Sequence, residues 1–97
     1  MLVGVPKEIK VLEHRVGLTP ASVREVVHHG HQAIVERDAG QGIGASDDDY
    51  ARAGATIAAT ASEVWAKAQL IVKVKEPQAA ERAMLKPGQL LFTYLHL

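Results

Sequence analysis

The fold class is indicated by residues 19–36, which read TPASVREVVHHGHQAIVE and change from a helical to a strand pattern. Thr19 supplies an N-cap oxygen, and Pro20 is pre-set for the first helical turn. Three valines then recur at positions i, i+3 and i+4, as on the buried face of a helix. Gly30 ends this helix, and Gln32–Glu36 reads as the following strand.

The same alternation extends in both directions along the chain. We expect further strands at residues 2–6, 56–57, 70–75 and 89–95, a helix from Ser46 to Gly54, and a helix opened by a Thr60–Glu63 capping box. Strands that alternate with short helices indicate an α/β fold with an open, mostly parallel sheet, Rossmann-like or flavodoxin-like. The chain stops directly after its most apolar strand, so we expect this domain to be incomplete here and part of a larger protein.

The amino-acid composition limits the classes of protein to which this chain can belong. The 97 residues suit a single domain, and 11 basic residues balance 11 acidic ones, which argues against nucleic acid as the main partner. The absence of cysteine excludes disulfides, a thiolate zinc site and a cysteine nucleophile. The apolar run at the amino end is too short for a signal peptide or a membrane helix. We therefore expect a cytoplasmic protein that has no membrane partner.

Three candidate site residues follow predicted strands. Arg15 lies in the long polar loop 7–18 after the first strand, Lys75 ends the 70–75 strand, and His96 directly follows the last strand. Ligands of open α/β sheets bind at the carboxyl ends of the strands, so these residues fall on one candidate edge. A guanidinium fork holds a carboxylate, an ammonium polarises an oxygen, and an imidazole exchanges a proton near pH 7. This set suits a small anionic molecule with a carbonyl group.

Each of these residues also has a purely structural interpretation. Arg15 can be a solvated loop charge, and His96 can be an ordinary histidine at a strand end. Lys73 and Lys75 share one face of a strand whose composition suggests burial. Either that face is partly wet or these lysines have partners.

Two other motifs do not predict sites. The histidines within residues 28–31 sit at a helix carboxyl end, where the dipole favours them, and they lack regularly spaced acidic ligands, so we predict no metal site. The glycines within residues 40–44 have the wrong spacing for a dinucleotide fingerprint, so we expect no NAD or ATP site in this chain. Trp65 and Phe92 are predicted core aromatics.

Four separated motifs carry a family resemblance. They are GVPKEIK at residues 4–10, EHRVGLTP at 13–20, VKVKEP at 72–77 and LFTYLHL at 91–97. Together they resemble the amino-terminal part of the alanine dehydrogenases. The amino-terminal part of the nicotinamide nucleotide transhydrogenase alpha subunit shares the first two motifs but not the FTYLH strand, and it is the alternative. A third interpretation is a non-catalytic assembly module that pairs through its last strand.

The resemblance implies the reversible, NAD-dependent oxidative deamination of L-alanine to pyruvate and ammonia. In that family Arg15 would hold the substrate carboxylate, Lys75 would bind the carboxylate or keto oxygen, and His96 would act as acid and base. Residues 1–97 would be the amino-terminal, substrate-binding part, with the NAD-binding domain in an absent portion. We therefore expect this chain to be inactive alone, and the intact enzyme to be a homo-oligomer.

Overall fold

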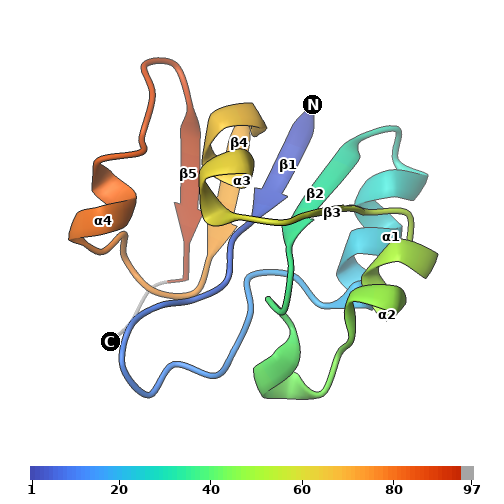
Figure 1. The fold of residues 1–97 in the computed structure, drawn as a ribbon. Coiled ribbons are helices and arrows are strands. Elements are labelled where there is room, and N and C mark those ends of the chain that lie inside the picture. The colour runs from blue at the N-terminus through green and yellow to red at the C-terminus, as the bar shows by residue number, and fades with distance from the viewer. Residues whose placement is uncertain (95–97) are drawn as a thin grey trace.

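A five-stranded parallel sheet forms the centre of the computed structural model, which describes residues 1–94 (Figure 1). The strands are β1 (Leu2–Val5), β2 (Gln32–Glu36), β3 (Thr56–Ala58), β4 (Leu70–Lys73) and β5 (Leu90–Thr93). Their order is β3-β2-β1-β4-β5, and each neighbouring pair is parallel. The predicted α/β class and parallel sheet are therefore confirmed. The strand order is that of a Rossmann-like rather than a flavodoxin-like sheet.

Helices connect the strands: α1 (Pro20–His28), the 3-10 helix η1 (Gln41–Ile43), α2 (Asp47–Arg52), α3 (Ala61–Lys67) and α4 (Ala79–Arg82). The predicted cap of α1 is present, with the Thr19 hydroxyl accepting from Ser22 N. The helix predicted to begin at Ser46 has a complete capping box at that residue. The capping box predicted for α3 is half formed. Thr60 accepts from Glu63 N, whereas the Glu63 carboxylate binds Lys67 instead of returning to the cap.

The core has two layers because β2 turns alternate side chains to opposite faces of the sheet. One layer joins β1 and β2 to the α1 and α2 side and contains Val5, Val16, Val23, Ala33, Val35, Ala39, Tyr50 and Ala53. The other lies under α3 and contains Ile34, Ala58, Val64, Trp65, Ala68 and Ile71. The sheet is thus covered on both faces around β1 and β2, and Trp65 is a core residue as predicted.

Two strand predictions need correction. The 70–75 strand ends at Lys73, because the amide groups of Val74 and Lys75 donate to the Glu8 carboxylate instead of to a neighbouring strand. On the last strand, Phe92 is not the core aromatic that was predicted, because β5 stands at the end of the strand order with its large side chains 40–55% exposed. None of the helices within residues 1–94 combines the length and the hydropathy needed to cross a bilayer.

Candidate substrate-binding site

The candidate site lies at the carboxyl edge of the sheet, where β1 and β4 are neighbours (Figure 1). The chain leaves β1 to reach β2 on one side, and β4 leads to β5 on the other side. Such a reversal of strand order leaves a crevice between the loops, which is where open α/β sheets bind ligands. Loop 6–19 after β1 and segment 74–78 after β4 border this crevice. They carry the predicted residues Arg15 and Lys75.

Loop 6–19 is held against the end of β4. Gly17 packs so closely on β4 that a Cβ atom there would overlap the carbonyl oxygen of Val72, so only glycine allows this approach. The Tyr94 hydroxyl donates to Gly17 O at 2.7 Å. The hydroxyl of the buried Tyr50 donates to Leu18 O at 2.7 Å, and burial followed by the charge of Asp49 raises the pKa of Tyr50 to about 12. The loop that carries Arg15 is therefore anchored by two tyrosine hydroxyls and by the close packing of Gly17 on β4.

The carboxylate of Glu13 brings Arg15 and Lys75 together. Its Oε1 accepts from Arg15 Nη2 at 2.8 Å, and its Oε2 accepts from Arg15 Nε at 3.0 Å and from the Arg15 amide at 2.8 Å. Lys75 Nζ lies 3.8 Å from Glu13 Oε1. The side chains of Glu13, Lys75 and Arg15 are 3%, 13% and 62% exposed, so the acid is buried beneath the arginine. We call Glu13, Arg15 and Lys75 the open cluster.

The electrostatics of the open cluster follow from these contacts. Hydrogen bonds from Arg15, opposed by burial, lower the pKa of Glu13 to about 2, and the charge of Lys75 adds to this effect. The same carboxylate raises the pKa of Arg15 further above its ordinary value. Glu13 and Arg15 are therefore both charged near pH 7. Two cations against one carboxylate leave one positive charge in excess.

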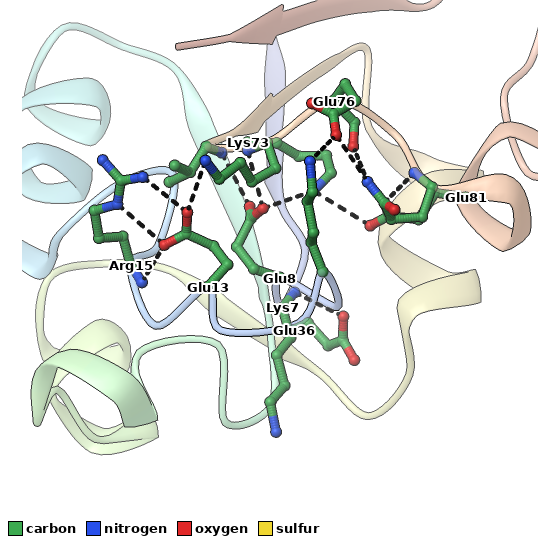
Figure 2. A network of polar contacts seen from close by, with 12 residues as sticks. Lys7, Glu8, Glu13, Arg15, Glu36, Lys73, Glu76 and Glu81 are labelled. Atoms are coloured by element: carbon green, nitrogen blue, oxygen red, sulfur yellow. Dashed lines mark hydrogen bonds and ion pairs between the residues drawn. The ribbon is translucent and has the colours of Figure 1, made fainter. Parts of the chain in front are cut away.

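A second group of ions lies deeper at the same edge (Figure 2). Lys73 Nζ lies 2.8 Å from Glu8 Oε1 and 3.4 Å from Glu81 Oε2, and each of these side chains is only 1–3% exposed. Glu8 also accepts from the amides of Val74 and Lys75. We call Glu8, Lys73 and Glu81 the buried cluster. The alternative in which the lysines have partners is thus the one observed.

Two hollows meet at Arg15. One, of about 300 Å³, is polar and is lined by Lys7, Glu8, Glu13, His14, Arg15, Asp38, Ala39, Gln41 and Gly42. The other, of about 280 Å³, is more apolar and is lined by Arg15, Val16, Thr19, Ile43, Val74 and Tyr94. Arg15 therefore stands between a polar and an apolar space. A small molecule with a carboxylate and a short apolar group matches such a surface.

His96 lies outside the described residues, and its role as an acid and base stays a prediction. The strand before it can be located, because β5 is parallel to β4 and pairs Thr93 with Lys73. The carboxyl end of β5 therefore lies at the same edge as Lys75. Tyr94, which follows β5, lines the apolar hollow with Arg15.

The glycine and histidine motifs have structural roles. A Cβ atom at Gly42 would overlap the carbonyl oxygen of His14, and one at Gly40 would lie 2.6 Å from the Tyr50 ring, so both glycines allow the close packing of this turn. His29 is the C-cap of α1, and its Nδ1 lies 2.8 Å from Glu25 O. Within residues 1–94, no group of acidic or histidine side chains is arranged to hold a metal ion.

The sequence did not identify Glu8 and Glu13 as functional residues. Both belong to the charged residues of the polar loop 7–18, and nothing in the local sequence distinguishes a buried carboxylate from a solvated one. The available signal was indirect. Lysines on a buried strand need carboxylate partners, and acids in a loop at the same sheet edge can supply them.

Comparison with known proteins identifies the family of this chain. The family model "Alanine dehydrogenase/PNT, N-terminal domain" matches residues 4–97. A curated alanine dehydrogenase from Halomonas elongata is 56% identical over 97 residues, which are 100% of this chain and 26% of that protein. The chain thus spans about a quarter of the length of the curated relatives that it matches.

Two solved structures are also similar. An L-alanine dehydrogenase superposes with a TM-score of 0.94 at 51% identity over 99% of this chain and 26% of that one. A transhydrogenase from Sinorhizobium meliloti superposes with a TM-score of 0.90 at 30% identity over 98% of this chain and 28% of that one. The transhydrogenase likeness is the weaker of these two. The chain belongs to the alanine dehydrogenase/PNT family and corresponds to its N-terminal domain.

Proposed function

We propose that this chain is the amino-terminal, substrate-binding part of an alanine dehydrogenase. The longer protein, here called the parent enzyme, would catalyse the reversible oxidative deamination of L-alanine to pyruvate and ammonia with NAD. The observation that carries this proposal is the convergence of Arg15 and Lys75 on one carboxylate beside the β1/β4 crevice. The relatives named alanine dehydrogenase support the choice of substrate.

The two cations have different tasks in this proposal. Arg15 binds the substrate carboxylate through the guanidinium edge that Glu13 does not occupy, because a planar fork fixes both the position and the plane of a carboxylate. Lys75 binds the keto oxygen or the carboxylate. An ammonium next to a keto oxygen stabilises the negative charge that develops on this oxygen when the carbonyl carbon is attacked. The methyl group of the substrate would lie toward the apolar hollow.

The cofactor, domain and assembly assignments belong to the same proposal. Residues 1–97 would form one domain, and NAD would bind to another part of the parent enzyme. The spacing of the glycines within residues 40–44, which is not that of a dinucleotide fingerprint, supports this. A homo-oligomeric assembly is proposed from the family resemblance, and a cytoplasmic location from the sequence.

The test of the proposed function is a coupled measurement on the purified parent enzyme. NADH formation that depends on both L-alanine and NAD, and its reversal with pyruvate and ammonium, is the expected result. Glycine and L-glutamate serve as matched amino-acid controls. A parent enzyme that passes hydride between two nucleotides without needing L-alanine would be a transhydrogenase instead.

His96 has a separate prediction. The variant His96→Ala should lower turnover on the order of a hundredfold, because an imidazole can carry a proton near neutral pH. The measurement is kcat at saturating L-alanine, with His28→Ala as the control because that histidine is exposed in the last turn of α1. A wild-type kcat for His96→Ala would remove it from the mechanism.

One observation favours a second candidate, an assembly module. Leu90, Leu91 and Phe92 are exposed on the strand that ends the sheet order, and such edges can pair with another chain. Light scattering after size exclusion of residues 1–97 separates this candidate from the first. A monomer at micromolar concentration would argue against it.

A further inference from the structure

Glu13 makes a dense set of polar contacts within the open cluster, and the roles above do not account for it. Its two carboxylate oxygens accept three hydrogen bonds from Arg15, at 2.8–3.0 Å, and Oε1 also faces Lys75 Nζ. The side chain is almost completely buried although it comes from a polar loop. An acidic side chain in a loop is ordinarily solvated, so the burial of this carboxylate between two cations has a specific structural cause.

The backbone before Glu13 is shaped to direct it inward. Leu12 has a φ of 67°, a left-handed conformation that is costly for a leucine, and its side chain is exposed. The turn is closed by Glu13 N donating to Lys10 O at 3.1 Å. Leu12, immediately before Glu13, therefore has both a strained backbone and an exposed apolar side chain. The carboxylate that results points to the underside of Arg15.

The contacts of Glu13 fix one edge of the Arg15 guanidinium. The Nε and Nη2 groups are bound, while Nη1 has no hydrogen bond within residues 1–94. An arginine whose side chain is 62% exposed would otherwise sample many rotamers, and ordering it would reduce the affinity for a ligand. With one edge held, the Nη1 end keeps a defined plane toward the crevice.

The charge of Glu13 also sets the balance of the site. It neutralises one of the two cations and leaves one positive charge, which matches a single carboxylate. Its pKa of about 2 keeps it ionised over the neutral range. Without it, two unneutralised cations would repel each other at short range, and both would tend to move apart.

We propose that Glu13 is a positioning residue, which holds the bound edge of Arg15 so that the free edge is ready for the carboxylate of a 2-oxo or 2-amino acid. This inference rests on the proposed function. A view that counts only the attraction between the substrate anion and the site would predict the opposite result for the loss of Glu13. Removing a negative charge from an anion site should weaken binding of the anion instead of strengthening it.

The test compares Glu13→Ala, Glu13→Gln and wild type in the purified parent enzyme, with KM and kcat measured for pyruvate and for L-alanine. KM should rise roughly three- to tenfold in Glu13→Ala, the range expected for ordering one long side chain on binding, with a smaller change in kcat. Glu13→Gln should give an intermediate KM, because its amide oxygen can still accept from one Arg15 donor. If Glu13→Ala does not fold, a rise in KM for Glu13→Gln decides the question.

The matched control is Glu76→Gln, which removes an acid next to Lys75 that pairs with Lys10 at 2.6 Å and makes no contact with Arg15. Its KM should stay within about twofold of wild type. A lower KM in the Glu13 variants would mean that Glu13 competes with the substrate for Arg15, and an unchanged KM in a folded variant would mean a structural role only. Either result overturns the inference while the proposed function stands. A wild-type parent enzyme without alanine-dependent NADH formation would overturn the proposed function and this inference with it.

Discussion

The open cluster and the buried cluster lie at the same sheet edge, and each contains three acidic or basic side chains, but the proportions of acids and bases are opposite. The buried cluster sets two carboxylates against one lysine and excludes water. The open cluster sets two cations against one carboxylate and exposes Arg15. The backbone of residues 73–75 connects the two clusters, because it contributes Lys73 to one and Lys75 to the other.

The difference lies in how the excess charge is compensated. Backbone amides of Val74, Lys75 and Gln78 donate to the two buried carboxylates at 2.9–3.2 Å, so the negative excess is compensated by the fold itself. The positive excess of the open cluster faces two hollows that meet at Arg15. The buried cluster, whose excess charge is compensated by backbone amides, stabilises the fold. The open cluster, whose excess charge is not compensated by the protein, can bind an ion from outside.

The largest effect is expected from breaking the buried cluster. The variant Lys73→Met keeps the length of the side chain but leaves Glu8 and Glu81 as buried carboxylates without their cation. Removing one partner of a buried ion pair costs about 3–5 kcal/mol, so the free energy of unfolding should fall by this amount. Urea denaturation of the purified protein measures it.

The control for this prediction is the same substitution in an exposed pair. Lys67 lies 3.3 Å from Glu63 on α3, with both side chains around half exposed. Lys67→Met should lower the stability by only about 0.3–0.5 kcal/mol. Equal losses in the two variants would contradict the distinction between buried and exposed pairs.

The sequence predicted most of the fold, because the signals that set it are local. Thr19-Pro20, Ser46 and Gly30 define helix ends by capping, and the β-branched runs define β2 and β4. Helix α4 was not predicted. It has only four residues, and its capping box begins with Gln78, a residue that seldom caps helices.

The errors in the strands have long-range causes. The end of β4 depends on Glu8, which lies 66 residues from Val74, and no local pattern shows that this carboxylate takes the strand's amide groups. The exposure of Phe92 depends on the edge position of β5, which is a property of the strand order. The hydrophobic pattern of a sequence shows that a strand is apolar, but it does not show which other elements pack against that strand.

The site was predicted in outline for a related reason. Parallel strands bring their carboxyl ends to one edge, so Arg15 and Lys75 could be assigned to the same crevice from topology alone. Glu13 could not be assigned to the crevice in this way, because its burial depends on the left-handed turn at Leu12 and on the approach of Gly17 to β4. Both are details of backbone path that residue types alone do not reveal.

The next prediction concerns the free edge of Arg15. Arg15→Lys keeps the positive charge of the open cluster but replaces the fork by a single ammonium, which cannot bind Glu13 and a substrate carboxylate bidentately at once. The dissociation constant for pyruvate in the parent enzyme should rise roughly tenfold, about 1.4 kcal/mol. Calorimetric titration measures it. Arg24→Lys, the same change on an exposed position of α1, is the control, and unchanged affinity in Arg15→Lys would refute the clamp role.

The smallest effect is expected from titrating the open cluster. Arg15 lowers the pKa of Glu13 from its ordinary value of 4.5 to about 2. A depressed folded-state pKa contributes stability that is fully present above the unfolded value of 4.5 and is lost as the pH falls toward about 2. Wild type and Glu13→Gln should therefore differ in unfolding midpoint by a constant amount above about pH 5, and the difference should shrink below it.

The comparison with Glu13→Gln is needed because Glu76 titrates in the same window. The hydrogen bond from Lys10 lowers the pKa of Glu76 to about 2 as well, so acid weakens both contacts in the wild type. Glu76 is present in both proteins, and subtracting their midpoints isolates Glu13. A difference that shrinks already between about pH 7 and 5 would mean that the Glu13 carboxylate is not held by Arg15 in solution, which would remove the bound edge on which the positioning role depends.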